Sequence, residues 1–260
     1  MNKNGEDLFL HSKIYDAIAF QENCSFISKI LYKKDNETWR RIYIESLNNL
    51  ALSYQILNDL DEAIRLQKES LKLIEMLFEE DKNSWDKDYV TAVKNLARSY
   101  HIQNAFKDAI PLEEKNLQLT IEKYEIDPNT WNKYYISSLI NLAQSYLKQG
   151  QIDEAIELQI INLTLVEELY EKNSRYWEKE YSQALENIAI SYNYKNLLEK
   201  ALVFQHKSIY ITEKLFSSNP NRWIRAYTAS LNNLGVSYSN NNRLEEARVI
   251  QEKNLNIIEP

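Results

Sequence analysis

Glycine, proline and cysteine are scarce in this chain. Only three glycines and four prolines occur among its 260 residues, so few sites exist for tight hairpins or strand turns. The single cysteine can neither close an internal disulfide nor make a zinc site. Because 44% of the residues are hydrophobic and 27% are charged, the composition is that of a folded protein, and we expect it to be nearly all helix.

Long apolar runs are also missing. No stretch approaches the roughly 18 apolar residues of a membrane-spanning helix, and the first twenty residues contain no continuous apolar region of a signal peptide. The net charge of −7 disfavours nucleic acid and anionic membrane surfaces as partners, because their binding requires clustered Lys and Arg. We therefore expect a cytoplasmic protein whose partners are neutral or basic.

The five tryptophans recur at one constant interval of 46 residues, without insertion or deletion. Such an interval indicates internal repeats, which decide the architecture. The sequence predicts a single helical-repeat domain over residues 1–260. Its predicted parts are a partial N-terminal unit, 1–38, followed by the repeats 39–84, 85–130, 131–176, 177–222 and 223–260.

Each repeat reads as two helices joined by a short polar turn. The turn contains a residue that tolerates left-handed backbone; these residues are Asn58, Asn104, Gly150, Asn196 and Asn242. The second helix should run for about 20 residues, or about 30 Å. Thr38, Ser84 and Thr130, each just before a tryptophan, are expected to cap the next first helix. Pro111 should kink its helix or delay the start of that helix.

The recurring residues resemble the signature of the tetratricopeptide repeat family. Leu50, Ala51 and Tyr54 are followed by Ala63 nine residues after the tyrosine, and small residues at such places let helices approach closely. The usual period is about 34 residues. The longer period here is more similar to the repeats of kinesin light chain, whose units read LxNLAxxY. The resemblance covers residues 14–260 and implies an all-α fold, a right-handed superhelical solenoid of antiparallel helix pairs.

The second helices depart from shorter family members at one place, where an aromatic residue is common. This chain has Gln67, Glu113, Gln159, Gln205 and Gln251 there. Helical geometry places these side chains beside the fixed alanine, facing the core. Because a buried amide without a partner is costly, we expect them to form hydrogen bonds within or between repeats.

An asparagine returns in every first helix at a place where helix propensity does not favour it. These residues are Asn49, Asn95, Asn141, Asn187 and Asn233. At about 100° per residue, Asn49 lies roughly 140° from the centre of the core face that contains Tyr43, Leu47 and Leu50. The positions beside the asparagines vary along the chain, and we predict that they select a ligand: Leu52, Ile56, Arg98, Ile102, Gln144, Ile190, Tyr194 and Val236.

Two interpretations of the asparagines remain open. An amide offers one acceptor and two donors, so a row of amides can bind the backbone of an extended peptide whatever its sequence. The resemblance supports this interpretation, since tetratricopeptide repeat proteins that bind extended segments carry an asparagine ladder on the inner face. In the alternative, each asparagine bonds the neighbouring repeat and only fixes the superhelix.

The sequence offers no recognisable catalytic constellation. His11, His101 and His206 fall at unrelated places of the repeat, and no nucleophile, base and acid are brought together by the period. Cys24 aligns with Ser70 and Asn116, which is typical of a small residue facing the core. Phosphate-binding loops and metal-spaced ligands are absent. We therefore expect no cofactor, no metal and no enzymatic activity.

The last helix bears on possible partners. It keeps Leu244, Val249, Ile250, Leu255 and Ile258, without the polar outer face expected of a terminal repeat. Either the natural chain continues there, or this end packs on something, including another copy. Two functions follow from the sequence: a scaffold that binds an extended protein segment, or a regulatory or sensor arm that controls a separate ATPase or protease in a bacterial signalling or defence complex.

Overall fold

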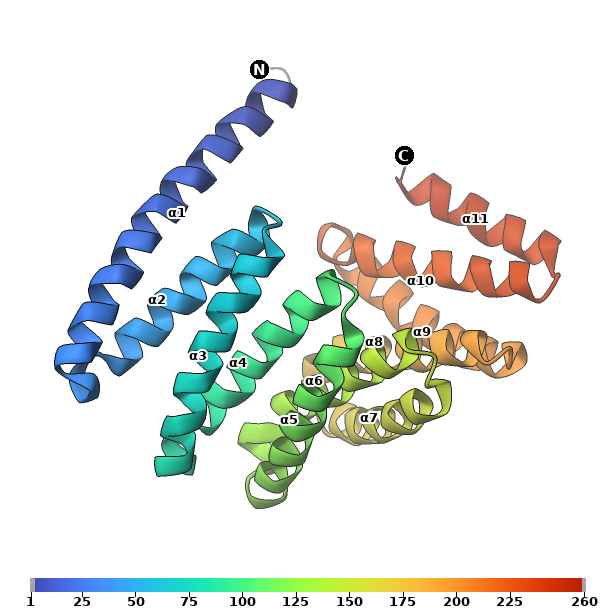
Figure 1. Ribbon diagram of the computed structural model, residues 1–260. Coiled ribbons are helices and arrows are strands. Elements are labelled where there is room, and N and C mark those ends of the chain that lie inside the picture. The colour runs from blue at the N-terminus through green and yellow to red at the C-terminus, as the bar shows by residue number, and fades with distance from the viewer. Residues whose placement is uncertain (1–2, 259–260) are drawn as a thin grey trace. The chain divides into compact units, whose positions relative to one another are not determined.

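The computed structural model describes residues 3–258, with side chains described for residues 13–257. Between residues 3 and 258 it contains eleven α-helices and no strand (Figure 1). The helices are α1 (Lys3–Lys34), α2 (Asn36–Ile56), α3 (Leu60–Glu80), α4 (Lys82–Ile102), α5 (Phe106–Ile126), α6 (Pro128–Lys148), α7 (Ile152–Lys172), α8 (Ser174–Tyr194), α9 (Leu198–Ser218), α10 (Pro220–Asn240) and α11 (Leu244–Ile258).

The chain forms two compact units, residues 1–120 and residues 121–260, whose boundary falls within α5. In the first unit each of α1, α2 and α3 packs against the helix that follows it. In the second unit the same holds from α6 to α11, and α8 also touches α10. Helices that pack on their neighbours in chain order confirm the predicted all-α fold of stacked helix pairs.

One register runs through all the repeats. The first helices begin at residues 36, 82, 128, 174 and 220, and the second helices begin at residues 60, 106, 152, 198 and 244. Both series advance by 46 residues. Since α5 begins at Phe106, in step with α3, Pro111 lies inside that helix and does not delay its start.

The turns between paired helices have the predicted left-handed backbone. Their φ angles are 64° at Asn58, 57° at Asn104, 80° at Gly150, 59° at Asn196 and 58° at Asn242. Asparagine and glycine adopt this conformation at lower cost than other residues. They end each first helix and allow the chain to reverse.

The helix caps differ from the sequence prediction. The first helices are capped three residues earlier, by Asp35, Asp81, Asp127, Asn173 and Asn219. The backbone N–H groups of Thr38, Ser84 and Thr130 donate to these caps. These three residues therefore lie in the first turn of their helices and are not the N-cap residues. The prediction was wrong because each first helix starts one turn before its tryptophan, where a short carboxylate or amide accepts the unpaired N–H groups.

The predicted core face of the first helices is confirmed. Tyr43, Leu47, Leu50 and Ala51 are buried, and Tyr54 is half-buried. The fixed alanine of each second helix is buried in all five repeats: Ala63, Ala109, Ala155, Ala201 and Ala247. An alanine leaves room for a neighbouring helix to approach closely, so this position sets how tightly the pairs pack.

A pair of aromatic rings in contact joins each first helix to the end of the preceding second helix, stacked in four pairs and tilted in Tyr124–Tyr135. The tyrosine four residues after each tryptophan supplies one ring of every pair. The ring centroids are 5.5 Å apart in Tyr32–Tyr43, 5.1 Å in Phe78–Tyr89, 5.1 Å in Tyr124–Tyr135, 4.7 Å in Tyr170–Tyr181 and 5.1 Å in Phe216–Tyr227. Such contacts add stability beyond the burial of the rings.

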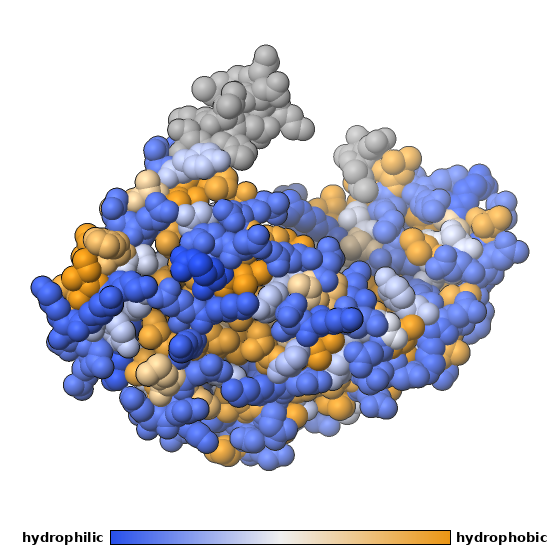
Figure 2. All heavy atoms as spheres, in the orientation of Figure 1, coloured by the Kyte–Doolittle hydropathy of each residue, from blue (hydrophilic) through white to orange (hydrophobic). Residues whose placement is uncertain are grey.

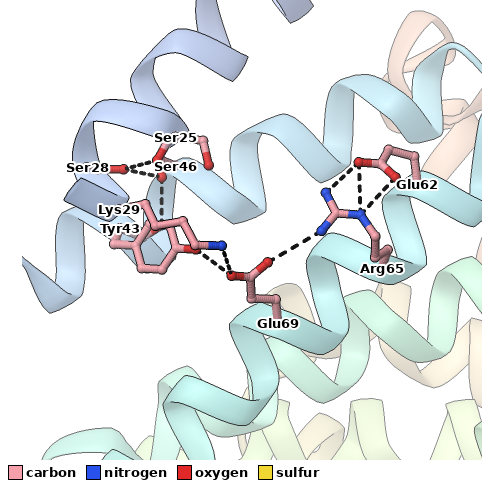
Figure 3. A network of polar contacts seen from close by, with 8 residues as sticks. All are labelled: Ser25, Ser28, Lys29, Tyr43, Ser46, Glu62, Arg65 and Glu69. Carbon is pink, nitrogen blue, oxygen red and sulfur yellow. Dashed lines mark hydrogen bonds and ion pairs between the residues drawn. The ribbon is translucent and has the colours of Figure 1, made fainter. Parts of the chain in front are cut away.

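A polar network at Tyr43 links α1, α2 and α3 (Figure 3). The Tyr43 hydroxyl donates to Glu69 Oε1 at 2.5 Å, and Lys29 Nζ donates to the same oxygen at 2.7 Å. Arg65 reaches the second Glu69 oxygen at 3.5 Å and also pairs with Glu62. Burial alone would raise the pKa of Glu69, but hydrogen bonds from Lys29 and Tyr43 outweigh it and lower that pKa.

The ion pair between successive second helices recurs with its charges exchanged. Where α1 has Lys29 and α3 has Glu69 (2.7 Å), α3 has Glu75 and α5 has Lys115 (3.2 Å). In the second unit, Glu213 of α9 pairs with Lys253 of α11 at 2.8 Å. Exposed pairs of this kind contribute little stability each. The position of the lysine nevertheless distinguishes the interface between α1 and α3 from the two others, because it lies on the earlier helix there and on the later helix in the others.

We expect the stabilising effect of the Tyr43 hydroxyl to disappear in strong alkali. Burial and the bond to Glu69 raise the pKa of Tyr43 to about 12. In the unfolded chain its pKa is near 10, so its contribution is complete below pH 10 and is lost as pH rises to about 12. Tyr43→Phe should cost about 1 kcal/mol at pH 8. Urea unfolding of both proteins at several pH values should show this difference shrinking above pH 10, whereas a constant difference would contradict the assignment.

The last helix, α11, carries both exposed apolar side chains and charged ones. Arg248 stands in register with Ile18, Ile64, Ile156 and Leu202, all of which are buried. It pairs with Glu245 at 3.4 Å and with Glu252 at 3.2 Å. Leu244, Val249 and Leu255 are exposed, Ile250 packs against the core, and the side chain of Ile258 lies outside the described residues. Three of the five apolar residues singled out at this end are therefore exposed among the described residues, and Arg248 adds a charge beside them.

Candidate functional site

The five recurring asparagines lie on the first helices, away from the core face. In the first unit, Asn49 of α2 is exposed and Asn95 of α4 is half-buried. In the second unit, Asn141 of α6, Asn187 of α8 and Asn233 of α10 are all half-buried. Each therefore reaches the surface from a rigid helix, which is the best support for a recognition group.

Four of the five side-chain amides form no hydrogen bond within the described residues. They are Asn49, Asn95, Asn141 and Asn187. Their positions are thus not explained by bonds to a neighbouring repeat. An amide that remains unbonded at the surface keeps both its donors and its acceptor for a ligand.

Asn233 is different. Its Nδ2 donates to Glu186 Oε2 on the neighbouring first helix at 2.6 Å. Its backbone oxygen accepts from Gln205 Nε2 at 3.2 Å. The other repeats offer no carboxylate where Glu186 stands, since their residues there are Asn48, Lys94, Ile140 and Asn232. The alternative role, in which the amide joins two repeats, is therefore seen at this asparagine.

In the first unit, the predicted selecting residues lie at the surface of α2 and α4. Leu52, Ile56 and Ile102 are exposed hydrophobic side chains, and Arg98 between them is also exposed. Together they present apolar contacts and one positive charge beside Asn49 and Asn95.

In the second unit, the predicted residues line two hollows. The first hollow, of about 280 Å³, lies between α8 and α10, and Asn233 and Val236 are part of its wall. The second hollow, also of about 280 Å³, lies between α6 and α8, and its wall includes Gln144 and Asn187. The structure thus brings together six of the seven residues predicted in this unit, the exception being Asn141.

Ile190 and Tyr194 belong to the walls of both hollows. One apolar side chain and one aromatic ring therefore separate two cavities that each hold a recurring asparagine. Chemically, each hollow can take an apolar side chain against Ile190 and Tyr194 while the asparagine reaches a polar backbone.

The floor of the hollows was missed by the sequence analysis. Gln159 of α7 and Gln205 of α9 line the second and first hollow respectively, and Asn193 lines the first. Within the described residues, one side-chain oxygen of each, Gln159 Oε1, Gln205 Oε1 and Asn193 Oδ1, is buried without a hydrogen-bond donor. These three oxygens are unpaired polar groups with almost no exposed surface. The recurring glutamine was the available signal, but the sequence could place it only in the core.

Hydrogen bonds of the recurring second-helix amides are confirmed at two positions. Gln67 Oε1 accepts from Ser99 Oγ at 2.7 Å, and Gln205 Nε2 donates to the backbone oxygen of Asn233 at 3.2 Å. Gln159 Oε1 is buried without a donor among the described residues. Glu113 is buried, with Oε1 3.1 Å from His101 Nε2. Gln251 departs from the pattern because it is exposed on α11, where no further repeat covers it in the described chain.

The described residues include neither a membrane-spanning helix nor a metal-binding cluster. Between residues 3 and 258, no helix combines the length and the apolar character needed to cross a membrane. Within the described chain, no three or more His, Cys, Asp or Glu side chains gather into a cluster that could hold a metal ion.

Comparison with known proteins identifies the repeat. The tetratricopeptide repeat family model matches residues 44–82, 136–175 and 228–259, and each match coincides with the pairing of a first helix with the second helix after it. The chain is a tetratricopeptide repeat protein. A search of curated protein sequences found no match for it.

Solved structures place this tetratricopeptide repeat protein among kinesin light chain-like folds. BtubC (BKLC) from P. vanneervenii is 16% identical, with a TM-score of 0.72 over 94% of this chain and 90% of that one. A kinesin light chain-type protein of Podosopora anserina with nearly identical TPR-like repeats is 20% identical, with a TM-score of 0.65 over 82% and 94%. Identities this low show a common fold.

A third similar structure belongs to a larger protein. It is a Signal Transduction ATPase with Numerous Domains (STAND) protein with a tetratricopeptide repeat sensor, from Pyrococcus horikoshii. The identity is 18% and the TM-score 0.61 over 92% of this tetratricopeptide repeat protein. The chain spans only 36% of that protein's length.

Proposed function

We propose that this protein is a non-catalytic scaffold that binds an extended peptide or protein segment along its first helices. The observation that carries the proposal is the pair of hollows in the second unit, whose walls combine fixed asparagines with variable neighbours. Tetratricopeptide repeat proteins bind protein partners, and this arrangement provides a means of doing so.

In this proposal, the asparagines provide affinity for the peptide backbone, and the variable residues beside them select the peptide's side chains. Asn187 has an amide that no described residue bonds, so it supplies donors and an acceptor to a peptide backbone of any sequence. Gln144, Ile190 and Val236 differ from their counterparts in other repeats and would choose side chains. Segments that bring an apolar side chain to Ile190 and Tyr194 fit best, because both residues line both hollows.

The role of the asparagine is tested by Asn187→Ala. A peptide selected from a random-peptide phage library on the immobilised full chain serves as the probe, and isothermal titration calorimetry measures its affinity. Loss of two hydrogen bonds of about 0.7 kcal/mol each should weaken binding about tenfold. Asn232→Ala is the matched control, because this neighbouring exposed asparagine lines neither hollow. Equal affinities for the Asn187 variant and the wild type would rule out the backbone-binding role.

A second candidate is a sensor or regulatory arm that controls a separate ATPase or protease in a bacterial signalling or defence complex. The likeness to the tetratricopeptide repeat sensor of the STAND protein favours it. The two functions differ in a measurable way. A scaffold binds the isolated segment as tightly as the protein that carries it, whereas a sensor arm changes the turnover rate of its folded catalytic partner.

A further inference from the structure

The first helix, α1, carries an apolar seam that no other described helix covers. In the other repeats, the second helix packs this side against the first helix of its own repeat, so Ala63 and Leu66 of α3 are buried. The register equivalents in α1 are Ala17 and Phe20, and both are exposed. Phe20 is 70% exposed, whereas Leu66 is 2% exposed.

The seam has the spacing of a helix-pairing surface. It consists of Ala17, Phe20, Cys24, Ile27 and Leu31. Steps of three and four residues in alternation are the a and d positions of a heptad pattern, which points one stripe of a helix at a partner helix. Phe20 and Ile27 are exposed, while Cys24 and Leu31 are half-buried. In Figure 2, hydrophobic side chains reach the surface along the left-hand edge of the view, where Figure 1 shows α1.

The length of α1 also sets it apart. It has 32 residues, whereas each helix from α2 to α10 has 21, and it projects past the end of α2 (Figure 1). The stripe from Ala17 to Leu31 covers about 21 Å of the helix. A partner helix along the seam takes the place that the first helix of a repeat takes elsewhere, next to α2, which packs on the side that holds Ile18, Ser25 and Ser28.

We infer that the seam pairs with the α1 seam of a second copy of this chain, in antiparallel orientation. Reversing one helix places Ala17 of one copy against Leu31 of the other, with Cys24 of both copies near the two-fold axis. Ala17 thus meets Leu31 at both ends and Phe20 lies near Ile27 between them, so the surface is complementary to itself, as a two-fold contact requires.

The charges that flank the seam favour the same pairing. Asp16 stands beside one end of the seam, and Lys34 stands beside the other; both side chains are exposed. An antiparallel pair brings Asp16 of each copy toward Lys34 of its partner, at both ends. A parallel pair would set like charges side by side, which is unfavourable. A helix from an unrelated protein would need this same pattern of charges.

The association is tested by sedimentation equilibrium of the full chain over a concentration series. We expect a species of twice the 30.8 kDa chain mass. Phe20→Glu should raise the dissociation constant at least thirtyfold, because two charged side chains then enter the seam, at a cost of roughly 2 kcal/mol or more. Its helix content by circular dichroism should not change, since Phe20 is exposed in the single chain. Ile27→Glu should act in the same way and checks that the effect belongs to the seam.

Phe26→Glu is the matched control. Phe26 is 65% exposed but lies outside the heptad stripe, so this variant should remain a dimer. A wild-type chain that stays monomeric at every concentration would overturn the inference. A dimer that survives Phe20→Glu and Ile27→Glu would place the interface elsewhere and would overturn it equally.

The orientation is tested by zero-length carbodiimide cross-linking followed by mass spectrometry. Asp16 and Lys34 of one copy are separated by about 27 Å along α1, so a bond between them can form only between two copies that run in opposite directions. We expect this cross-link in the wild type and in Phe26→Glu, and its loss in Phe20→Glu. A dimer without any Asp16–Lys34 cross-link would refute the antiparallel arrangement.

Discussion

Replacing Tyr181 with alanine is expected to lower the free energy of unfolding by about 3–5 kcal/mol, the range for large aromatic truncations in cores. The ring of Tyr181 is buried and stacks on Tyr170 with centroids 4.7 Å apart. This stack joins α7 to α8, so its loss weakens the interface between two repeats. In a linear array of repeats, the stability of such an interface is shared with both neighbours.

The measurement is urea unfolding followed by circular dichroism, with Tyr181→Phe as the matched variant. Phenylalanine keeps the ring stack and removes only the bond in which the Tyr181 hydroxyl donates to Glu167 Oε1 at 2.6 Å. That variant should lose about 1 kcal/mol. If both variants were equally unstable, the hydroxyl and not the ring would hold this interface together.

Replacing Tyr194 with aspartate is expected to weaken peptide binding at least thirtyfold, or about 2 kcal/mol. Tyr194 contributes to both hollows of the second unit, so a single charge at this place disturbs two contact sites at once. Since its side chain is 57% exposed, the substitution should leave the fold intact. The affinity is measured by calorimetry with the same phage-selected peptide.

Tyr210→Asp provides the control for charge and for loss of an aromatic ring. Tyr210 is 73% exposed on the second helix α9 and lines neither hollow. This variant should bind the peptide like the wild type. Equal weakening in both variants would show that a general change of charge, and not the hollows, governs binding.

The helices were largely predictable from the sequence because their signals are local. The constant 46-residue interval gave the helix order, and the left-handed turns followed from residues such as Asn196 and Gly150. The caps were less predictable, since Asp35 and Thr38 are both common cap residues. In the folded chain, Asp35 accepts the Thr38 N–H at 3.1 Å.

The candidate site was predictable only in part, because its shape depends on contacts between repeats. The helical period located Asn187, Ile190 and Tyr194 on one face, but it could not show that they enclose cavities. Nor could it show that Glu186 accepts a hydrogen bond from Asn233, 47 residues later. Such a bond depends on the side chain at a position that varies among the repeats, so the recurring pattern cannot predict it.

The uniform register has a consequence for how this gene could change. Every aromatic pair and every left-handed turn occupies the same place in its repeat. Recombination that duplicates or deletes one 46-residue block therefore preserves these contacts and turns in the repeats that remain. The number of helix pairs can therefore grow or shrink while the interior stays the same. The opening block is an exception, since a rearrangement that put the Lys29 helix next to the Lys115 helix would set two ammonium groups face to face, where an ion pair now stands.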